Sequence, residues 1–317
     1  MLLSSPAFRA VKSAPGRFLA VAAGPVNFPA VFRSPFIDEV LLFTPREYLL
    51  KPWKLVSFVR KIRKNGFDAC IVPSTVSFSL TSALLSAMSG AKIRIGADGK
   101  RFGFYADSGF FFNIEVRQAD GAVKHQTDIN LDFLKPLGME TADKSENMGL
   151  SGEEKAYAQG VLDSFGIRTG DTLIGVHPGA GKIPNRWQAE NFARAADALI
   201  ENCGAKVLAM FGPKEAEVKR KFLDSVKTRG NLHIVPQTNI RNIAAVIGRC
   251  RVFVCNDTGV LHAAAAVNTP TVAMFGPTDP KQWNPPGEKH LALVSKSGKI
   301  EDITAADCVS AVKGMLG

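Results

Sequence analysis

The residues most suited to chemistry lie directly after an apolar run, in the segment VCNDTGVLHAAAAV at positions 254–267. The apolar run predicts a buried strand, and the alanine-rich run predicts a helix. Asp257 or Thr258 can cap that helix, whose first backbone amides lack partners within the helix and carry a partial positive charge. Such a helix start can bind a diphosphate, with His262 in its early turns. The alternative is a capped core helix that contains a buried histidine.

A second segment, GVHPGAGKIPNRW at positions 175–187, also follows a strand-like run. Gly179 and Gly181 would let the backbone approach a ligand closely, and free amides in such a loop can bind an anion. Lys182 adds a positive charge to the same loop. A Gly/Pro loop after a strand is more often only a turn, so this segment alone is a weak indication.

Two further loops follow strand-like runs, in FGPKEAEV and FGPTDPKQWNP. Glu215, in the first of them, begins a helix, where an acidic residue suits the helix dipole. Its carboxylate could equally accept hydrogen bonds from a ribose. All four loops leave the carboxyl ends of strands in one predicted sheet, so they can converge on one crevice.

Several other classes of site have no matching motif. The sequence has no GxxxxGK[ST] loop, no complete GxGxxG at a strand–helix turn, no GxSxG elbow and no HExxH helix. These absences argue against an NTPase, a dehydrogenase, a serine hydrolase and a zinc protease. The five cysteines form no CxxC pair and no zinc pattern, which predicts buried, reduced thiols. We therefore expect no metal and no cofactor.

Strand-like and helix-like segments alternate along the whole chain. This pattern predicts an α/β protein with a doubly wound parallel sheet in each half. The polar segment ETADKSENMGLSGEE, at positions 140–154, interrupts the alternation and indicates a domain boundary. We predict two domains, residues 1–150 and residues 151–317, and the last helix could pack back on the first domain.

The charge is unevenly distributed. The formal net charge is +10, and residues 1–140 hold 18 Lys and Arg against 11 Asp and Glu. A basic half suggests an anionic partner such as a phosphorylated glycolipid or a membrane surface, although it can also serve only solubility. No RNP, helix-turn-helix or zinc-finger signature favours nucleic acid. Arg60, Arg63 and Lys64 cluster at the end of a predicted helix and are candidates for the acceptor or membrane side, unless they form an ordinary solvated face.

The chain has no apolar run near the roughly 20 residues that a bilayer-spanning helix needs. Its first residues do not combine a basic segment with an apolar one, as a secretory signal would. We expect a cytoplasmic location. The protein could also attach peripherally to the inner face of the cytoplasmic membrane.

Three segments in this order, HPGAG…NRW, FGPKE and NDTGVLHAAAAVNTPTVAMFGPTDPKQWNP, resemble glycosyltransferase family 9. Its best-known members are the ADP-heptose:lipopolysaccharide heptosyltransferases. The first half also resembles the acceptor domain of that family, in SSPAFRAVKSAPG, FVRKIRKNGFDACIV, SALLSAMSGAKIRIG and HQTDINLDFLKPLG. The resemblance implies a GT-B fold, in which two Rossmann-like domains face each other across a cleft. It also implies an inverting, metal-independent transfer from a nucleoside diphosphate sugar, first of all ADP-heptose, to the lipopolysaccharide inner core.

The resemblance assigns roles to individual residues. Donor contacts near the diphosphate and sugar would come from Asp257, Thr258, Gly259, Val260 and His262, the ribose contact from Glu215, and first-loop contacts from Gly179 and Ala180. Relatives commonly carry Lys where this chain has Asn185, and Lys182 could reach the phosphates instead.

The general base of the family has no match in this sequence. Relatives usually open with a strand and a Gly-Asp turn, and Met1 falls just after the position of that turn. The catalytic residue is therefore unknown, and His125, Asp98 or Asp107 could substitute. We expect donor binding with poor transfer. A catalytically silent nucleotide-sugar-binding protein and a hydrolysing or epimerising sugar-nucleotide enzyme are the alternatives.

Overall fold

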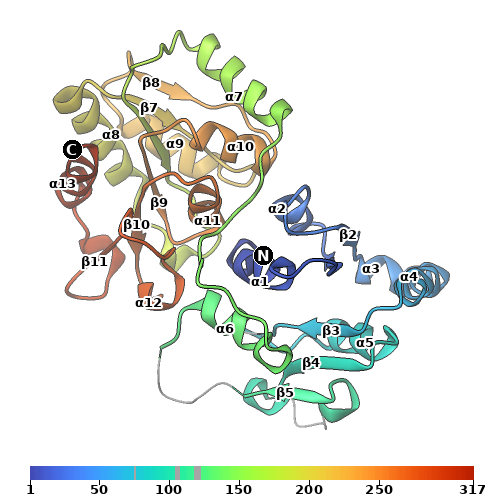
Figure 1. Cartoon of the computed structure of the whole chain (residues 1–317). Coiled ribbons are helices and arrows are strands. Elements are labelled where there is room, and N and C mark those ends of the chain that lie inside the picture. Colours follow the sequence, from blue (N-terminus) through green and yellow to red (C-terminus); the bar gives the residue numbers. More distant parts are fainter. Residues whose placement is uncertain (75, 104–107, 118–122) are drawn as a thin grey trace. The chain divides into compact units, whose positions relative to one another are not determined.

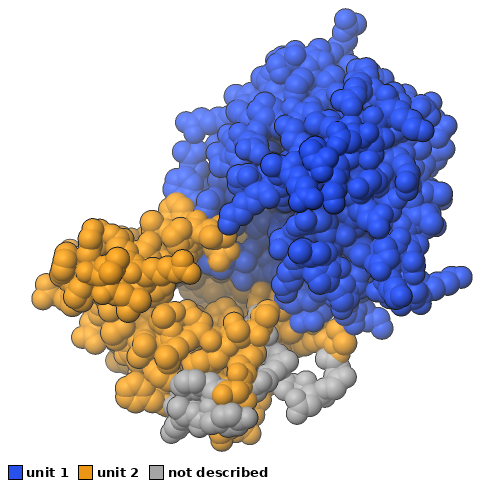
Figure 2. Space-filling view, turned by 180° about the vertical axis from the view of Figure 1, so that it is seen from behind, with its two compact units in different colours: residues 1–5, 29–35, 144–317 blue, residues 6–28, 36–143 orange. Residues whose placement is uncertain are grey.

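The computed structural model describes residues 1–74, 76–103, 108–117 and 123–317, so Asp107 lies outside the described residues. The chain divides into two compact units (Figures 1 and 2). Unit 1 contains Met1–Ser5, Pro29–Pro35 and Lys144–Gly317, and unit 2 contains Pro6–Phe28 and Phe36–Asp143. This division differs from two consecutive domains, because two short N-terminal segments pack with the C-terminal half.

Unit 1 contains a six-stranded, fully parallel sheet with the order β11-β10-β9-β6-β7-β8. The central strands β6, β9 and β10 consist entirely of buried residues, as expected for a sheet covered on both faces. The strands are β6 (Leu173–His177), β7 (Lys206–Ala209), β8 (Leu232–Ile234), β9 (Val252–Asn256), β10 (Thr271–Phe275) and β11 (His290–Val294).

Helices cover both faces of this sheet, and successive strand residues contribute to opposite faces. The helices are α7 (Gly152–Ser164), α8 (Ala189–Cys203), α9 (Ala216–Ser225), α10 (Ile240–Ile247), α11 (Gly259–Ala266) and α13 (Ala305–Leu316). Ile174 of β6 belongs to the core beneath α8, α9 and α13, whereas Leu173 belongs to the core beneath α7, α10 and α11. The last helix packs in unit 1, where Cys308 and Val312 are fully buried.

Unit 2 contains two separate parallel sheets, β1-β2 and β3-β4-β5. The strands are β1 (Ala20–Ala23), β2 (Glu39–Leu42), β3 (Ala69–Val72), β4 (Ile93–Ala97) and β5 (Ile114–Val116). The main helices are α1 (Ser5–Lys12), α3 (Pro45–Leu50), α4 (Pro52–Asn65), α5 (Leu80–Met88) and α6 (Gln126–Asp132). Among the described residues the sheet expected for this half is divided in two, because β1 pairs with β2 and β3 pairs with β4.

The sequence pattern also missed two strands and three short helices. β5 has only three residues, and β11 is an edge strand in which His290 alone is buried. Neither strand shows the buried apolar run by which the central strands are recognised. The missed helices are α2 (Phe28–Val31), α3 and α12 (Pro280–Trp283).

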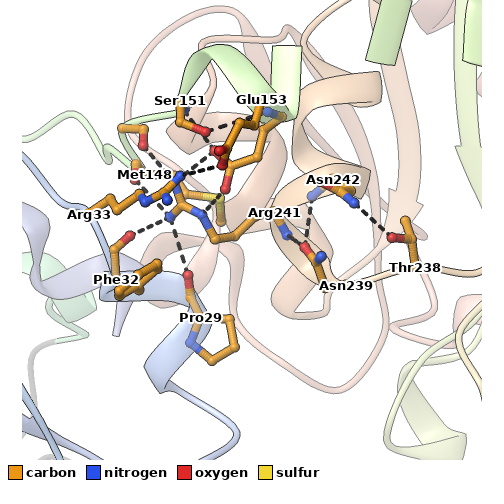
Figure 3. Close-up of polar contacts among 12 residues, drawn as sticks. Pro29, Phe32, Arg33, Met148, Ser151, Glu153, Thr238, Asn239, Arg241 and Asn242 are labelled. Atoms are coloured by element: carbon orange, nitrogen blue, oxygen red, sulfur yellow. Dashed lines mark hydrogen bonds and ion pairs between the residues drawn. The ribbon is translucent and has the colours of Figure 1, made fainter. Parts of the chain in front are cut away.

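A buried ion pair holds two segments, residues 29–32 and residues 148–149, against the core of unit 1 (Figure 3). The guanidinium of Arg241, on α10, pairs with Glu154, on α7, with Nη2 and Oε2 3.0 Å apart. It also donates to the backbone carbonyls of Phe32 and Gly149, each at 2.6 Å. These contacts explain why residues 29–35 belong to unit 1. The hydrogen bonds from the Arg241 guanidinium to the Glu154 carboxylate lower the pKa of Glu154 to about 2.

Within the described residues, no helix combines the length and the apolar composition that crossing a bilayer requires.

Candidate functional site

The sheet of unit 1 has a topological switch point between β6 and β9. These strands are hydrogen-bonded neighbours, with His177 opposite Cys255. The chain leaves β6 toward α8 and β7 on one side, and it leaves β9 toward α11 and β10 on the other. In such sheets the ligand crevice lies outside the carboxyl ends of the strands at this point. The four loops singled out from the sequence all leave this same edge, because every strand pair is parallel.

Asn256, the last residue of β9, connects two of these loops. It is completely buried, and its side-chain amide donates to the carbonyls of Pro178 and Gly179 at 2.9 and 3.1 Å. Its side-chain carbonyl accepts from the amide of Trp187 at 2.9 Å. Asn256 thus fixes the loop after β6 against the end of β9. Sequence analysis did not single it out, although an Asn that ends an apolar strand is a recognisable signal.

Glu215 packs directly against the backbone of Gly179. A Cβ atom at Gly179 would lie 1.9–2.2 Å from the Glu215 carboxyl group, so only glycine fits there. The carboxylate accepts from the amide of Gly212 at 2.7 Å and lies 3.6 Å from Nε2 of His177. Glu215 is therefore held at the opening of the first loop, where it remains partly exposed.

His177 is a buried ring beneath this loop that sequence analysis did not select. Its Nδ1 lies 3.0 Å from the carbonyl oxygen of Met210, a geometry that suits donation by Nδ1–H. Burial lowers the pKa of His177, and the nearby carboxylate of Glu215 opposes that shift. Glu215 is thus held by the Gly212 amide, and the ring of His177 packs beside it.

The start of α11 has no side-chain cap. Thr258 occupies the N-cap position but accepts no hydrogen bond there. The carboxylate of Asp257 instead accepts from the hydroxyl of Thr278 at 2.7 Å and from the side-chain amide of Asn185 at 3.2 Å. The expectation that Asp257 or Thr258 caps this helix is therefore wrong. As a result, no side chain among the described residues accepts a hydrogen bond from the backbone amides of Gly259 and Val260 in the first turn.

The loop after β10 packs closely on the loop after β6. A Cβ atom at Gly276 would come within 2.9 Å of the carbonyl oxygen of Pro184. Arg186 donates to the carbonyl of Ala180 at 2.7 Å, which orders the turn between them. The Lys182 side chain is exposed, and its amine has no hydrogen-bond or ion-pair partner among the residues that the structure describes. Its amine is therefore available to an anion at this edge of the sheet.

His262 lies one turn into α11 and is mostly buried. Its Nδ1 is 2.9 Å from a carboxylate oxygen of Glu146, whose side chain is completely buried. Glu146 was not a candidate from the sequence, since it belongs to the polar segment read as a boundary. The structure thus joins the boundary segment to the start of α11.

The candidates from the first half of the chain belong to unit 2. Arg60 and Lys64 are exposed on α4 and have no described partner, whereas Arg63 donates to the carbonyl of Met88 at 2.9 Å. Asp98 and His125 each accept a hydrogen bond from a backbone amide as helix N-caps. These contacts give both side chains a structural role.

The assembled edge of unit 1 offers two kinds of recognition. Free helix amides and Lys182 suit phosphate oxygens, and the carboxylates of Glu215 and Asp257 suit hydroxyl groups. Among the residues that the structure describes, no three His, Cys, Asp or Glu side chains gather as metal ligands. The edge therefore combines an anion site with hydroxyl acceptors, as a nucleotide or sugar phosphate would need.

Comparison with known proteins gives the same indication. The sequence profile of glycosyltransferase family 9 (heptosyltransferase) matches residues 55–311. The chain is 24% identical to lipopolysaccharide heptosyltransferase 2 of Escherichia coli (strain K12), over 97% of this chain and 88% of the relative. The fold matches E. coli ADP-heptose lps heptosyltransferase II with a TM-score of 0.80 and 22% identity, covering 100% of this chain and 95% of that one. It also matches a glycosyl transferase family 9 structure from Veillonella parvula DSM 2008, with a TM-score of 0.83, 22% identity, and coverage of 99% and 93%.

These matches confirm the expected α/β fold of GT-B type. The family profile spans most of both units, including all four loops of the site. The chain therefore belongs to glycosyltransferase family 9, the heptosyltransferase family, and is a glycosyltransferase.

Proposed function

We propose that this protein transfers heptose, or a related sugar, from a nucleoside diphosphate sugar to the inner core of lipopolysaccharide. ADP-heptose is the first choice of donor, because the name of one structural relative combines ADP-heptose with lipopolysaccharide. The observation that carries the proposal is the convergence of four strand-end loops at the switch point between β6 and β9.

In this proposal the diphosphate binds at the start of α11. The amides of Gly259 and Val260 and the amine of Lys182 stabilise the charge that develops on the leaving diphosphate as the glycosidic bond breaks. Glu215 accepts hydrogen bonds from the ribose hydroxyls. The backbone of Gly179 and Ala180 borders the nucleotide, and Thr258 and Asp257 lie beside the diphosphate and sugar. No metal is needed if these groups supply the charge stabilisation.

We propose an inverting transfer, in which the acceptor hydroxyl attacks the anomeric carbon on the face opposite the diphosphate. The attacking hydroxyl must lose its proton during this step. Since the donor groups all belong to unit 1, unit 2 is proposed to bind the acceptor.

The acceptor is proposed to be anionic and lipid-linked, and the protein to work at a membrane surface. On α3 and α4, Leu49, Leu50 and Trp53 are exposed at 85%, 80% and 64%. Arg60 and Lys64 are exposed on the same α4. Exposed apolar side chains together with unpaired basic ones are typical of a surface that binds at an anionic lipid interface.

Calorimetry with ADP-heptose, ADP, and UDP and GDP sugars tests the donor site, and a transfer assay on a heptose-deficient lipopolysaccharide acceptor tests the activity. We expect tightest binding of the ADP compounds and transfer that persists in a chelator, with the opposite anomeric configuration in the product. A folded protein that binds none of these nucleotides would contradict the proposal. Donor binding without transfer would indicate a silent nucleotide-sugar-binding protein, and donor turnover without acceptor would indicate a hydrolase or an epimerase.

A further inference from the structure

The two oxygens of the Asp257 carboxylate have different surroundings. Oδ2 accepts two hydrogen bonds, from the hydroxyl of Thr278 at 2.7 Å and from the side-chain amide of Asn185 at 3.2 Å. Oδ1 accepts none from the residues that the structure describes, and it is not a buried atom. One oxygen therefore anchors the carboxylate, and the other stays open at the edge where the donor is proposed to bind.

This arrangement fixes the direction of the open oxygen. Two other carboxylates of unit 1, those of Asp197 and Glu154, use both of their oxygens in hydrogen bonds. In Asp257 both donors bind the same oxygen, and they come from two loops that are far apart in the sequence, the loop after β6 and the loop after β10. Because the anchor comes from two sides, the carboxylate cannot turn away from the edge without losing a hydrogen bond.

The sheet separates Asp257 from the other carboxylate of the donor edge, Glu215. Asp257 directly follows β9, and Glu215 belongs to the loop after β7, with β6 between the two strands. Neighbouring strands are about 4.8 Å apart, so these two strand ends are roughly 10 Å apart. The two carboxylates therefore serve different parts of an extended ligand. With the ribose at Glu215 and the diphosphate at the start of α11, the part that remains for Asp257 is the transferred sugar.

The chemistry of a carboxylate supports the same assignment. An ionised carboxylate can only accept hydrogen bonds, whereas the oxygens of a diphosphate carry negative charge and have no proton to donate. Sugar hydroxyl groups do donate, and a hydrogen bond to a charged acceptor is stronger than one between neutral groups. The open oxygen of Asp257 therefore suits a hydroxyl group and not the diphosphate beside it.

We infer that Thr278 and Asn185 are positioning residues of the donor site, which together hold Oδ2 of Asp257 so that Oδ1 accepts a hydrogen bond from a hydroxyl group of the transferred sugar. This inference rests on the proposed function and adds to it the reason why the loop after β10 belongs to the site. Neither positioning residue touches the ligand. Their effect on binding should therefore depend on whether the ligand carries the sugar.

Calorimetry with ADP-heptose and with ADP separates the sugar from the nucleotide. Thr278→Val removes the hydroxyl and keeps the shape of the side chain. We expect it to weaken ADP-heptose binding about 10-fold, the size of one lost hydrogen bond to a charged group. ADP affinity should change by less than about 2-fold. Asn185→Ala should act in the same direction, and Thr278→Ser, which keeps the hydroxyl, should retain the affinity for ADP-heptose.

A double variant shows whether Thr278 acts through the carboxylate. Asp257→Ala should itself weaken ADP-heptose binding relative to ADP binding. The combination T278V/D257A should then bind ADP-heptose no more weakly than D257A alone, because the hydroxyl of Thr278 has no carboxylate left to hold.

Thr269→Val is the matched control. The hydroxyl of Thr269 is buried in unit 1 and donates to the carbonyl of Ile247 at 3.0 Å. This change should lower stability and leave the ratio of the two affinities unchanged. Circular dichroism reports the fold of every variant, and N185A provides the test if T278V does not fold.

Three results would overturn the inference: unmodified ADP-heptose affinity in folded T278V and N185A, equal losses for ADP and ADP-heptose, or additive losses in the double variant. Equal losses would assign Thr278 and Asn185 to the general structure of the edge. If the unmodified protein binds neither ADP nor ADP-heptose, the proposed donor site itself fails, and this inference fails with it. Binding of both ligands with a ratio that T278V leaves unchanged contradicts the inference alone.

Discussion

At the scale of single residues, the donor edge depends on close approach between backbone and side chain. The Glu215 carboxyl group occupies the space where any side chain at position 179 would begin. It is oriented there by the amide of Gly212, and the buried ring of His177 lies beside it. The role of Gly179 is thus steric, and it allows an acidic group to sit at the rim of an anion-binding loop.

Gly179→Ala tests this arrangement. The added methyl group must displace Glu215, so we expect donor affinity to fall about 10- to 100-fold, the loss of a hydrogen bond to a charged group. Calorimetry with ADP-heptose measures the change. Gly230→Ala is the control elsewhere in unit 1, since a Cβ atom there meets nothing within 4 Å. Equal affinities for the two variants would contradict the assigned role of Glu215.

At the scale of secondary-structure elements, the site depends on how strand ends are joined. The two strands at the switch point pair through their backbones, but their loops are connected by one side chain, Asn256. Its three hydrogen bonds satisfy buried backbone groups on the loop after β6 and at the start of α8. The loop after β6 is therefore held at the end of β9 without any ligand.

Asn256→Ala should remove this connection. It leaves buried carbonyls and an amide without partners, so we expect the free energy of unfolding to fall by about 2–4 kcal/mol. Donor affinity should fall as well, because the loop that contains Gly179 is released. Urea unfolding and calorimetry measure the two effects. Asn202→Ala, the same change at an exposed position of α8, should have neither effect. A stable N256A variant with normal affinity would show that the loops are held by other contacts.

At the scale of the whole molecule, Arg241 joins segments that are far apart in the sequence. It holds residues 29–32 and 148–149 against α10 through backbone carbonyls, and its charge is balanced by Glu154 (Figure 3). Both segments lie next to points where the chain passes between the units. The ion pair thus fixes the ends of the connecting segments on unit 1.

This pair predicts an acid-sensitive contribution to stability. The folded-state pKa of Glu154 is about 2, below its ordinary value of 4.5. Its contribution is therefore complete above pH 4.5 and is lost as the pH falls toward 2. A depression of this size corresponds to roughly 3 kcal/mol.

Glu154→Gln should accordingly lower the free energy of unfolding by about 3 kcal/mol at pH 7, and its difference from the unmodified protein should shrink below pH 4.5. Chemical unfolding of both proteins between pH 7 and pH 2 measures this. Glu153→Gln is the control, because Glu153 is exposed on the same helix and its pair with Arg33 should contribute no more than about 1 kcal/mol. A difference that stays constant down to pH 2 would contradict the account of this pair.

The basic, partly apolar surface of α3 and α4 gives the second prediction at this scale. Binding to vesicles that contain anionic phospholipid should weaken as salt rises, because exposed charges are screened. Arg60→Ala/Lys64→Ala should lower vesicle affinity about 10-fold or more, at roughly 1 kcal/mol for each basic residue near the surface. Trp53→Ala should weaken binding even at high salt. Lys155→Ala/Arg249→Ala removes two exposed charges from unit 1 as a control, and equal losses in both double variants would contradict a specific surface on α4.

The sequence by itself determined most of the helices and strands and the location of the donor loops. Hydrophobic periodicity is visible in α4 and α8, and the left-handed glycines Gly66, directly after α4, and Gly138 have φ of 63° and 64°. The four loops were recognisable because glycine and polar residues directly follow apolar runs. These signals are local, since each depends on residues within a turn or two of one another.

Only the tertiary structure decided which distant residues meet. Asn185 contacts Asp257 across 72 positions, Glu146 contacts His262 across 116, and Arg241 reaches residues 29–32 across more than 200. A polar side chain carries no local signal of its partner, because any nearby acceptor or donor satisfies its chemistry equally well. The packing of helices on the sheet selects the partner. For the same reason, the sequence pattern predicted a side-chain cap for α11 that the fold does not form. In the folded protein the carboxylate of Asp257 accepts from Thr278 and Asn185 instead, and the N-cap residue of α11 makes no side-chain hydrogen bond to the first turn.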